Sequence, residues 1–312
     1  MPFMVSVNKF SLYIGIPLLL VIYLAYVLGS FFFYDDQGRL EAIETHFNNV
    51  AERQDINAII LGGSNSLFSL SADMLSEQTP MRFYNASIVN EGFSSQNYFK
   101  FIEDLFTSKQ AEKVKLVFYS PIHIVRSDEQ MNEAKTRKKD ILGKEDFPGL
   151  LPEKTFARFL IDQLKSLTKQ ERFYGNVTSQ GDFIFKGFNC EYEPGRESEF
   201  KAPSTDAVLS RINERQNFVQ TKFPNARLVI VFPLEYDADP SIRNHYFNRV
   251  SSKLKDESIE FIIQESTQDS SLICDAKHHT NDKGRTFRTN DLINQLLENL
   301  ETSKAPPQRI RQ

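Results

Sequence analysis

Short apolar runs alternate with longer stretches of helical periodicity along most of the chain. The runs are rich in Val, Ile, Leu, Phe and Tyr, as buried strands are. They span residues 58–61, 82–86, 114–119, 227–232 and 259–263. The helical stretches span residues 93–105, 205–222, 242–254 and 282–300. This alternation predicts an α/β fold with one sheet of five parallel strands, joined by right-handed crossovers.

The N-terminal stretch 10–34 is apolar and contains no charged residue. A helix needs roughly 20 apolar residues to span a bilayer, and a cleavable signal has a shorter core, so we predict an uncleaved signal anchor. Lys9 precedes the stretch and Asp35 and Asp36 follow it, which places residues 1–9 in the cytoplasm. The rest of the chain then lies on the periplasmic side of the inner membrane. The alternative is a buried helix of a soluble core.

The remaining chain divides into a connector, a domain and a tail. The polar, helix-compatible connector spans 35–55, the α/β domain 56–300, and a tail expected to be disordered 301–312. A charged segment with many Gly and Pro residues, about 126–201, interrupts the domain and reads as an insertion. It is either a lid or substrate platform, or a cap over a sheet edge.

Charge and cysteine content exclude several classes of partner. The net charge is -4 and no long basic stripe is present, so nucleic acid is not expected to bind. The two cysteines, Cys190 and Cys274, and the scattered histidines do not form a metal-ligand set, and no cofactor is expected. In an exported domain the two cysteines form either one disulfide or two buried thiols.

The first apolar run leads directly into Gly62, Gly63 and Ser64. Open α/β sheets bind ligands at the carboxyl ends of their strands, and the glycines allow a sharp turn that exposes the serine as a nucleophile. The alternative is an ordinary helix start, with Ser64 or Asn65 as the N-cap.

Complementary groups lie more than two hundred residues downstream, at Asp275, His278 and His279. A catalytic imidazole needs a group that orients it, and an aspartate on the same loop can do so. Either histidine can be the base, and the alternative is a surface loop without chemistry. Combined with Ser64, the loop predicts a Ser/His/Asp hydrolase or acyltransferase.

With these motifs the chain resembles the SGNH, or GDSL-like, hydrolase superfamily, over roughly residues 55–300. The family's first block, Gly-Asp-Ser, corresponds to Gly62 to Ser64, and its last block, Asp-x-x-His, to Asp275 to His279. The continuation His-x-Asn-x-x-Gly is matched from His279 to Gly284, which favours His279 over His278 as the base. The resemblance implies a flavodoxin-like three-layer sandwich and a covalent acyl-serine intermediate.

Two departures from the family concern the oxyanion hole. Gly63 replaces the aspartate of the first block, and the Gly-x-Asn-Asp block is missing after the third strand. The resemblance implies an oxyanion hole formed by an amide at the serine, by Gly92, and by Asn90 or Ser120 in place of the missing asparagine.

Similar membrane-anchored chains move acetyl or other acyl groups on exported bacterial polysaccharides. The resemblance therefore implies an envelope polysaccharide as substrate and other polysaccharide-assembly proteins as partners. The alternative is a noncatalytic saccharide-binding or scaffold protein with the same fold. Aromatic residues of the insertion are candidates for stacking on sugar rings, although core packing is the commoner fate of phenylalanine. They are Phe173, Tyr174, Phe183, Phe185 and Phe188.

Overall fold

The computed structural model places most of the chain outside the insertion and the ends. It describes residues 17–21, 23, 34–89, 95–121, 124, 177–185, 190, 192, 200–237, 239–264, 266–274 and 276–304, without the side chains of 34–41, 44, 95–97 and 298–304. The chain divides into two compact units, Met1–Glu41 with Lys144–Gly175, and Ala42–Gly143 with Asn176–Gln312. The second unit contains the sheet and the candidate site.

Five parallel strands form one sheet in the order β2-β1-β3-β4-β5. They are β1 (Ala58–Gly62), β2 (Phe83–Asn85), β3 (Leu116–Ser120), β4 (Arg227–Val231) and β5 (Glu260–Ile262). The predicted parallel sheet is confirmed. This strand order is that of flavodoxin-like doubly wound sheets, in which the order of strand addition reverses between β1 and β3.

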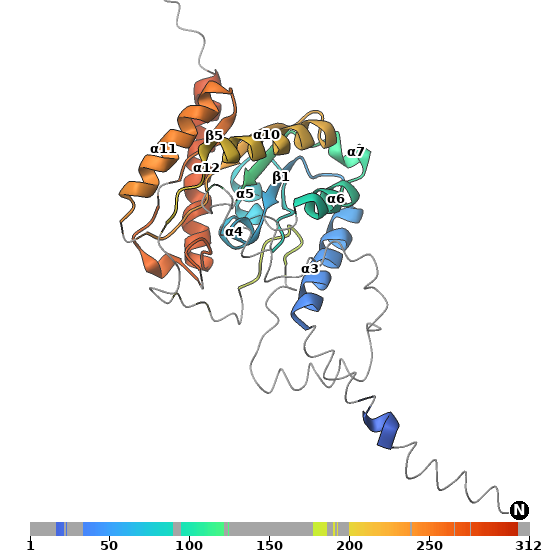
Figure 1. Cartoon of the computed structure of the whole chain (residues 1–312). Helices are drawn as coiled ribbons and strands as arrows, with labels where there is room; N and C mark the ends of the chain where they lie inside the picture. Colours follow the sequence, from blue (N-terminus) through green and yellow to red (C-terminus); the bar gives the residue numbers. More distant parts are fainter. Residues whose placement is uncertain are drawn as a thin grey trace, which may run out of the picture. The chain divides into compact units, whose positions relative to one another are not determined.

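Helices connect the strands and flank the sheet (Figure 1). They are α3 (Tyr34–Ala51), α4 (Ser64–Ser69), α5 (Ala72–Gln78), α6 (Ser95–Leu105), α7 (Ser108–Ala111), α10 (Thr205–Lys222), α11 (Ser241–Asp256), the 3-10 turn η4 (Ser270–Leu272) and α12 (Asp282–Lys304). The four predicted helical stretches are confirmed as α6, α10, α11 and α12. Helix α12 runs past residue 300 and so overlaps the stretch expected to be the tail.

Both faces of the sheet are buried, which explains why the strands read as continuous apolar runs rather than alternating ones. On one face Ile59, Val117 and Ile230 pack in a core with side chains of α3, α6, α10 and α11. On the other face Ile60 and Phe118 pack in a second core with side chains of α5 and α12.

Helix α3 covers most of the predicted connector 35–55 and begins one residue before it. Ala42, His46 and Val50 repeat every four residues and are buried, so one stripe of the helix belongs to the domain core. The Gln110 side chain donates to the Val50 and Arg53 carbonyls, at 2.8 and 2.7 Å, and so satisfies carbonyl groups at the helix C-terminus.

Residues 177–183 of the insertion cover the outer edge of the sheet. The backbone amide of Asn85, on the edge strand β2, donates a hydrogen bond to the Gln180 carbonyl at 2.8 Å. The Asp182 carboxylate accepts hydrogen bonds from the backbone amides of Ala72 and Asp73, the first two residues of helix α5, at 2.7 and 2.9 Å. Burial raises the pKa of Asp182 to about 6, against the opposing effect of these donors. This part of the insertion therefore caps a sheet edge, which is one of the two roles considered for it.

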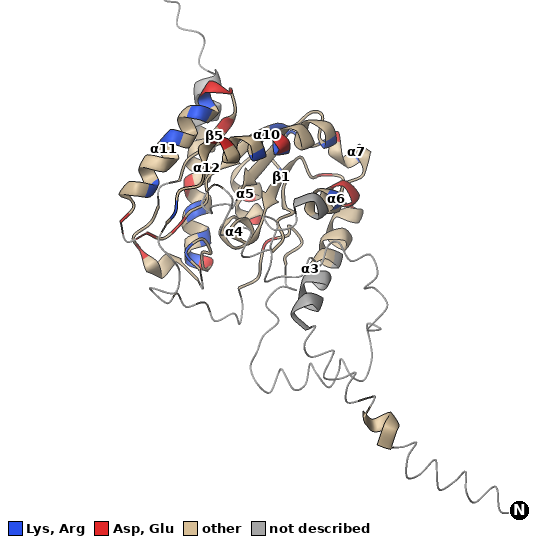
Figure 2. Ribbon diagram, in the orientation of Figure 1, with Lys and Arg blue, Asp and Glu red and all other residues tan. Residues whose placement is uncertain are grey.

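Among the described residues no helix is long and apolar enough to cross a membrane. Of the predicted span 10–34, only residues 17–21, 23 and 34 belong to that part of the chain. Basic and acidic residues are mixed on α10 (Figure 2), which carries Arg211, Glu214 and Arg215.

Candidate functional site

Ser64 lies at the carboxyl end of β1, next to the end of β3, where Gly62 pairs with Ser120. This is the point of the doubly wound sheet at which ligands bind. A Cβ on Gly62 would lie 2.1 Å from Ser66 Oγ and 3.0 Å from the Ser120 carbonyl oxygen, so no side chain fits there. Gly63 is extended and precedes helix α4, whose first residue is Ser64. Ser64 is half-buried, while the rest of α4 is buried.

His279 is brought to Ser64 by a tight loop that precedes α12. The Cys274 amide donates to the His279 carbonyl at 2.7 Å, and the His279 amide donates to the Ala276 carbonyl at 2.9 Å. His279 Nε2 lies 2.7 Å from Ser64 Oγ, although the two residues are 215 positions apart. The structure thus joins the two most distant parts of the predicted site by a side-chain hydrogen bond.

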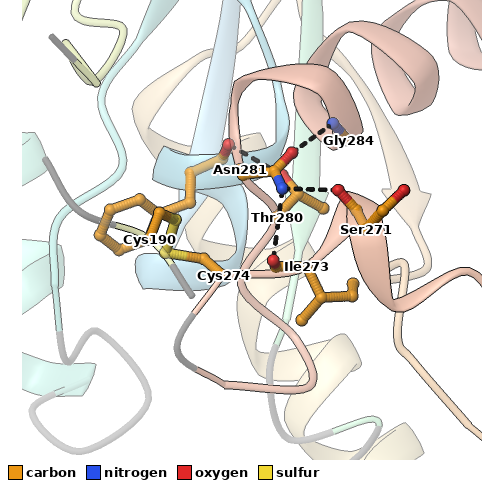
Figure 3. Close-up of a disulfide and its surroundings, with 8 residues drawn as sticks. Cys190, Ser271, Ile273, Cys274, Thr280, Asn281 and Gly284 are labelled. Carbon is orange, nitrogen blue, oxygen red and sulfur yellow. Dashed lines mark hydrogen bonds between the residues drawn. A yellow bond between two sulfur atoms is a disulfide. The ribbon is translucent and has the colours of Figure 1, made fainter. Parts of the chain in front are cut away.

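The residues after His279 hold this loop against the start of α12 (Figure 3). Asn281 Oδ1 accepts from the Gly284 amide at 3.0 Å, and its Nδ2 donates to the Ser271 and Ile273 carbonyls at 2.7 and 3.3 Å. A Cβ on Gly284 would lie 2.1 Å from the Leu272 carbonyl oxygen. The His-x-Asn-x-x-Gly pattern therefore has a local physical cause, namely a helix cap and a close backbone contact.

A disulfide joins Cys190 of the insertion to Cys274, with Cα atoms 4.6 Å apart (Figure 3). Of the two cysteine states considered from the sequence, the structure contains the bridged one. Cys274 is fully buried and lies five residues before His279, so the bridge anchors the base of the histidine loop.

Several predicted site residues lie outside the described part of the chain. They are Asp275, Asn90 and Gly92, together with Phe173, Tyr174 and Phe188 of the insertion.

His278 is placed differently from its neighbour. It is 5% exposed, and its ring centroid is 4.4 Å from that of His279. The hydrogen bond to Ser64 is made by His279. Of the two histidines, the preferred base His279 contacts the serine, and His278, the alternative, packs beside it.

Aromatic residues support the histidine from the side of α4. The Phe68 ring lies 4.8 Å from the His279 ring, and the Phe183 ring lies 4.6 Å from Phe68. Phe183 is 2% exposed, so it packs in the core instead of presenting a face to a ligand. Phe185 is half-buried, and the Arg285 guanidinium lies 4.7 Å from its ring centroid.

Beneath the site lies a buried polar network that was not predicted from the sequence. Asn65 Nδ2 donates to the carbonyl and the hydroxyl of Ser120, at 2.9 and 3.2 Å. Arg288 of α12 also donates to the Ser120 hydroxyl, at 2.9 Å, and to the Gln264 side chain, at 2.6 Å. Ser120, considered as an oxyanion donor, is fully buried and held within this network. The sequence signal for this network is Arg288 itself, which lies four residues from both Gly284 and Leu292 and so on the apolar stripe of the last helix.

The arrangement can carry out nucleophilic acyl chemistry. With the His279 proton on Nδ1, the neutral Nε2 accepts the hydrogen bond from the Ser64 hydroxyl and can remove its proton. Among the described residues no group of three or more His, Cys, Asp or Glu residues could hold a metal ion.

No protein-family model matches the chain, and no curated protein matches it. Among solved structures it is similar to an acetyl xylan esterase, Est2A, from the rumen bacterium Butyrivibrio proteoclasticus, at a TM-score of 0.39 and 9% sequence identity. The similarity covers 80% of this chain and 65% of that one, so the chain spans less than two thirds of the esterase.

Proposed function

We propose that this protein is a serine acyl esterase or O-acyltransferase that acts through an acyl-serine intermediate. The observation that carries the proposal is the 2.7 Å contact between His279 Nε2 and Ser64 Oγ, at the carboxyl edge of a doubly wound sheet. A half-buried serine bonded to a histidine from a distant loop has the geometry of a nucleophile and its base. Asp275 is proposed as the group that orients His279.

The reaction follows from these roles. Ser64 Oγ attacks the acyl carbonyl carbon while His279 Nε2 takes the hydroxyl proton. The tetrahedral intermediate expels the alcohol, which receives that proton from His279. Water or a sugar hydroxyl then gives a proton to His279 and attacks the acyl-serine, and Ser64 is regenerated with its proton. Water yields hydrolysis, and a sugar hydroxyl yields transfer.

Helix α4 supplies part of the proposed oxyanion hole. Ser64 and Asn65 are the first two residues of this helix, and neither backbone amide donates a hydrogen bond to an acceptor among the described residues. Amides at a helix start lack intrahelical acceptors and attract developing negative charge. Gly92 and Asn90 are proposed as the further donors.

The proposed substrate is an acylated, and specifically acetylated, envelope or exported polysaccharide. The resemblance to the envelope branch of the SGNH superfamily supports this class. We further propose that stretch 10–34 anchors the protein in the inner membrane, with the domain in the periplasm and other polysaccharide-assembly proteins as partners. The disulfide Cys190–Cys274 supports an oxidising compartment.

A noncatalytic saccharide-binding or scaffold protein is the second candidate function. One observation favours it: the end of β3, where the family carries its oxyanion asparagine, carries Ser120, which is buried and bonded to Asn65 and Arg288. Losing one oxyanion donor costs an enzyme about a hundredfold or more in rate.

Labelling with a fluorophosphonate probe tests the proposal. The purified full chain should be labelled, and Ser64→Ala should abolish labelling. Ser69→Ala is the matched control, because Ser69 is a buried serine of the same helix whose hydroxyl bonds to no described residue. His279→Ala should also abolish labelling, whereas His278→Ala should retain it. Absence of labelling in the folded parent would refute the enzyme and support the binding protein.

A further inference from the structure

Arg288 lies at the centre of the buried network and contacts the ends of four strands or the turns that follow them. Its guanidinium donates to the Asn65 carbonyl after β1 at 3.1 Å and to the Ser120 hydroxyl at the end of β3 at 2.9 Å. It also donates to the Phe232 carbonyl after β4 at 2.9 Å and to the Gln264 side chain after β5 at 2.6 Å. One side chain therefore links the carboxyl ends of β1, β3, β4 and β5, the end of the sheet at which Ser64 lies.

The Arg288 side chain also connects the turn that carries Ser64 to the helix that follows His279. Asn65 directly follows Ser64, and Arg288 lies on the helix that begins three residues after His279. The hydrogen bond between Arg288 and the Asn65 carbonyl thus fixes the serine turn relative to the helix that carries the histidine loop. Thr280 makes a second such link, because its hydroxyl donates to the Phe68 carbonyl of α4 at 3.0 Å.

The chemistry of the site explains why arginine is needed. Arg288 is fully buried and its four acceptors are uncharged, so the side chain is costly to bury and is held by directional hydrogen bonds. A planar guanidinium presents five donors in a fixed fork, whereas lysine presents a single ammonium group. Only the fork reaches all four acceptors at once, one at the end of β3 and the others after β1, β4 and β5.

We infer that Arg288 is a positioning residue that holds Ser64 in register with His279. This inference rests on the proposed function, since it concerns the same serine and histidine. A shift of about 1 Å between reacting groups costs about a hundredfold in rate. Without the fork, the Ser64 turn and the helix after the histidine loop keep only the link through Thr280, and the hydrogen bond between Ser64 and His279 lengthens.

The test compares fluorophosphonate labelling rates of the full chain with those of Arg288→Lys and Arg288→Met, at a temperature where circular dichroism shows each variant folded. We expect about a hundredfold slower labelling in both. Leu254→Ala is the control for lost stability, because Leu254 is a fully buried residue of α11 in the core on the other face of the sheet. It should lower the melting temperature and leave the labelling rate unchanged.

The outcomes separate this inference from the proposed function. A folded Arg288→Lys variant that is labelled at the parental rate would overturn the positioning role and leave the enzyme proposal intact. If neither Arg288 variant folds, the labelling rate of Gln264→Met tests the positioning role. This substitution removes the side-chain oxygen after β5 that accepts a hydrogen bond from Arg288 Nε and so orients the guanidinium. Slower labelling of folded Gln264→Met supports the role, and an unchanged rate overturns it.

A folded parent that is not labelled would refute the proposed function, and the positioning role then requires a readout without turnover. The ¹⁵N chemical shift of the His279 imidazole provides one. Ser64→Ala should change this shift in the parent and leave it unchanged in the Arg288→Lys background. An equal change in both backgrounds would overturn the inference.

Discussion

His46 makes the stability of the domain depend on pH. It lies on α3, is 1% exposed, and its Nδ1 is 2.8 Å from the Tyr84 hydroxyl. Burial lowers the pKa of His46 from 6.5 to about 4, opposed by a hydrogen bond to the Ser87 backbone. The folded protein therefore keeps this imidazole neutral at pH values where the unfolded chain protonates it.

The sign and size of the effect follow from linkage. Above pH 6.5 the side chain is neutral in both states and its contribution to stability is complete. Between pH 6.5 and about 4 only the unfolded state binds the proton, so the free energy of unfolding falls as the pH falls. The difference between the two pKa values corresponds to about 3 kcal/mol. That is a large share of the 5–15 kcal/mol typical of a domain.

The assay is urea unfolding of the full chain and of His46→Gln between pH 7.5 and pH 4. Glutamine does not titrate, and its amide can still bond to Tyr84. Relative to the parent, His46→Gln should gain about 3 kcal/mol of stability across this range. The control is His245→Gln, which replaces an exposed histidine of α11 and should follow the parent curve. Parallel curves for the parent and His46→Gln would refute the reasoning.

Two further predictions concern the disulfide and the serine turn. Replacing Cys190 and Cys274 by serine should lower the free energy of unfolding by about 2 to 5 kcal/mol, because the bridge closes a loop of 84 residues. Urea unfolding measures this, and reductant should destabilise the parent but not the variant. Gly62→Ala should destabilise by about 1 to 3 kcal/mol, because its Cβ would lie 2.1 Å from Ser66 Oγ. Adding Ser66→Ala should recover part of this loss, and no recovery in the melting temperature would contradict the packing argument.

The sheet and the longer helices could be predicted because their signals are local. Parallel strands buried on both faces form apolar runs, and α10 and α12 repeat their apolar positions over several turns. Helices α4 and α5 were not predicted because each is shorter than two full turns, and because half of the residues of α4 are serines. Such short helices are stabilised by tertiary contacts, which local patterns do not reveal.

The pairing of Ser64 with His279 could be expected from the sequence because each residue belongs to a recognisable motif. The support around it was not, because its partners are distant and individually ordinary. Arg288 bonds to Asn65 across 223 positions, and Asp182 caps α5 across more than a hundred. An isolated arginine or aspartate in a sequence carries no sign of the element that it will contact.

The distance along the chain between Ser64 and His279 also has a consequence for biosynthesis. Translation at about 5–20 residues per second separates the emergence of the two residues by roughly 10 to 40 seconds. During that time the serine has no histidine beside it, and an isolated hydroxyl is a poor nucleophile. Ser64 of the nascent chain therefore stays a poor nucleophile toward acyl donors until the loop that carries His279 has been made and folded.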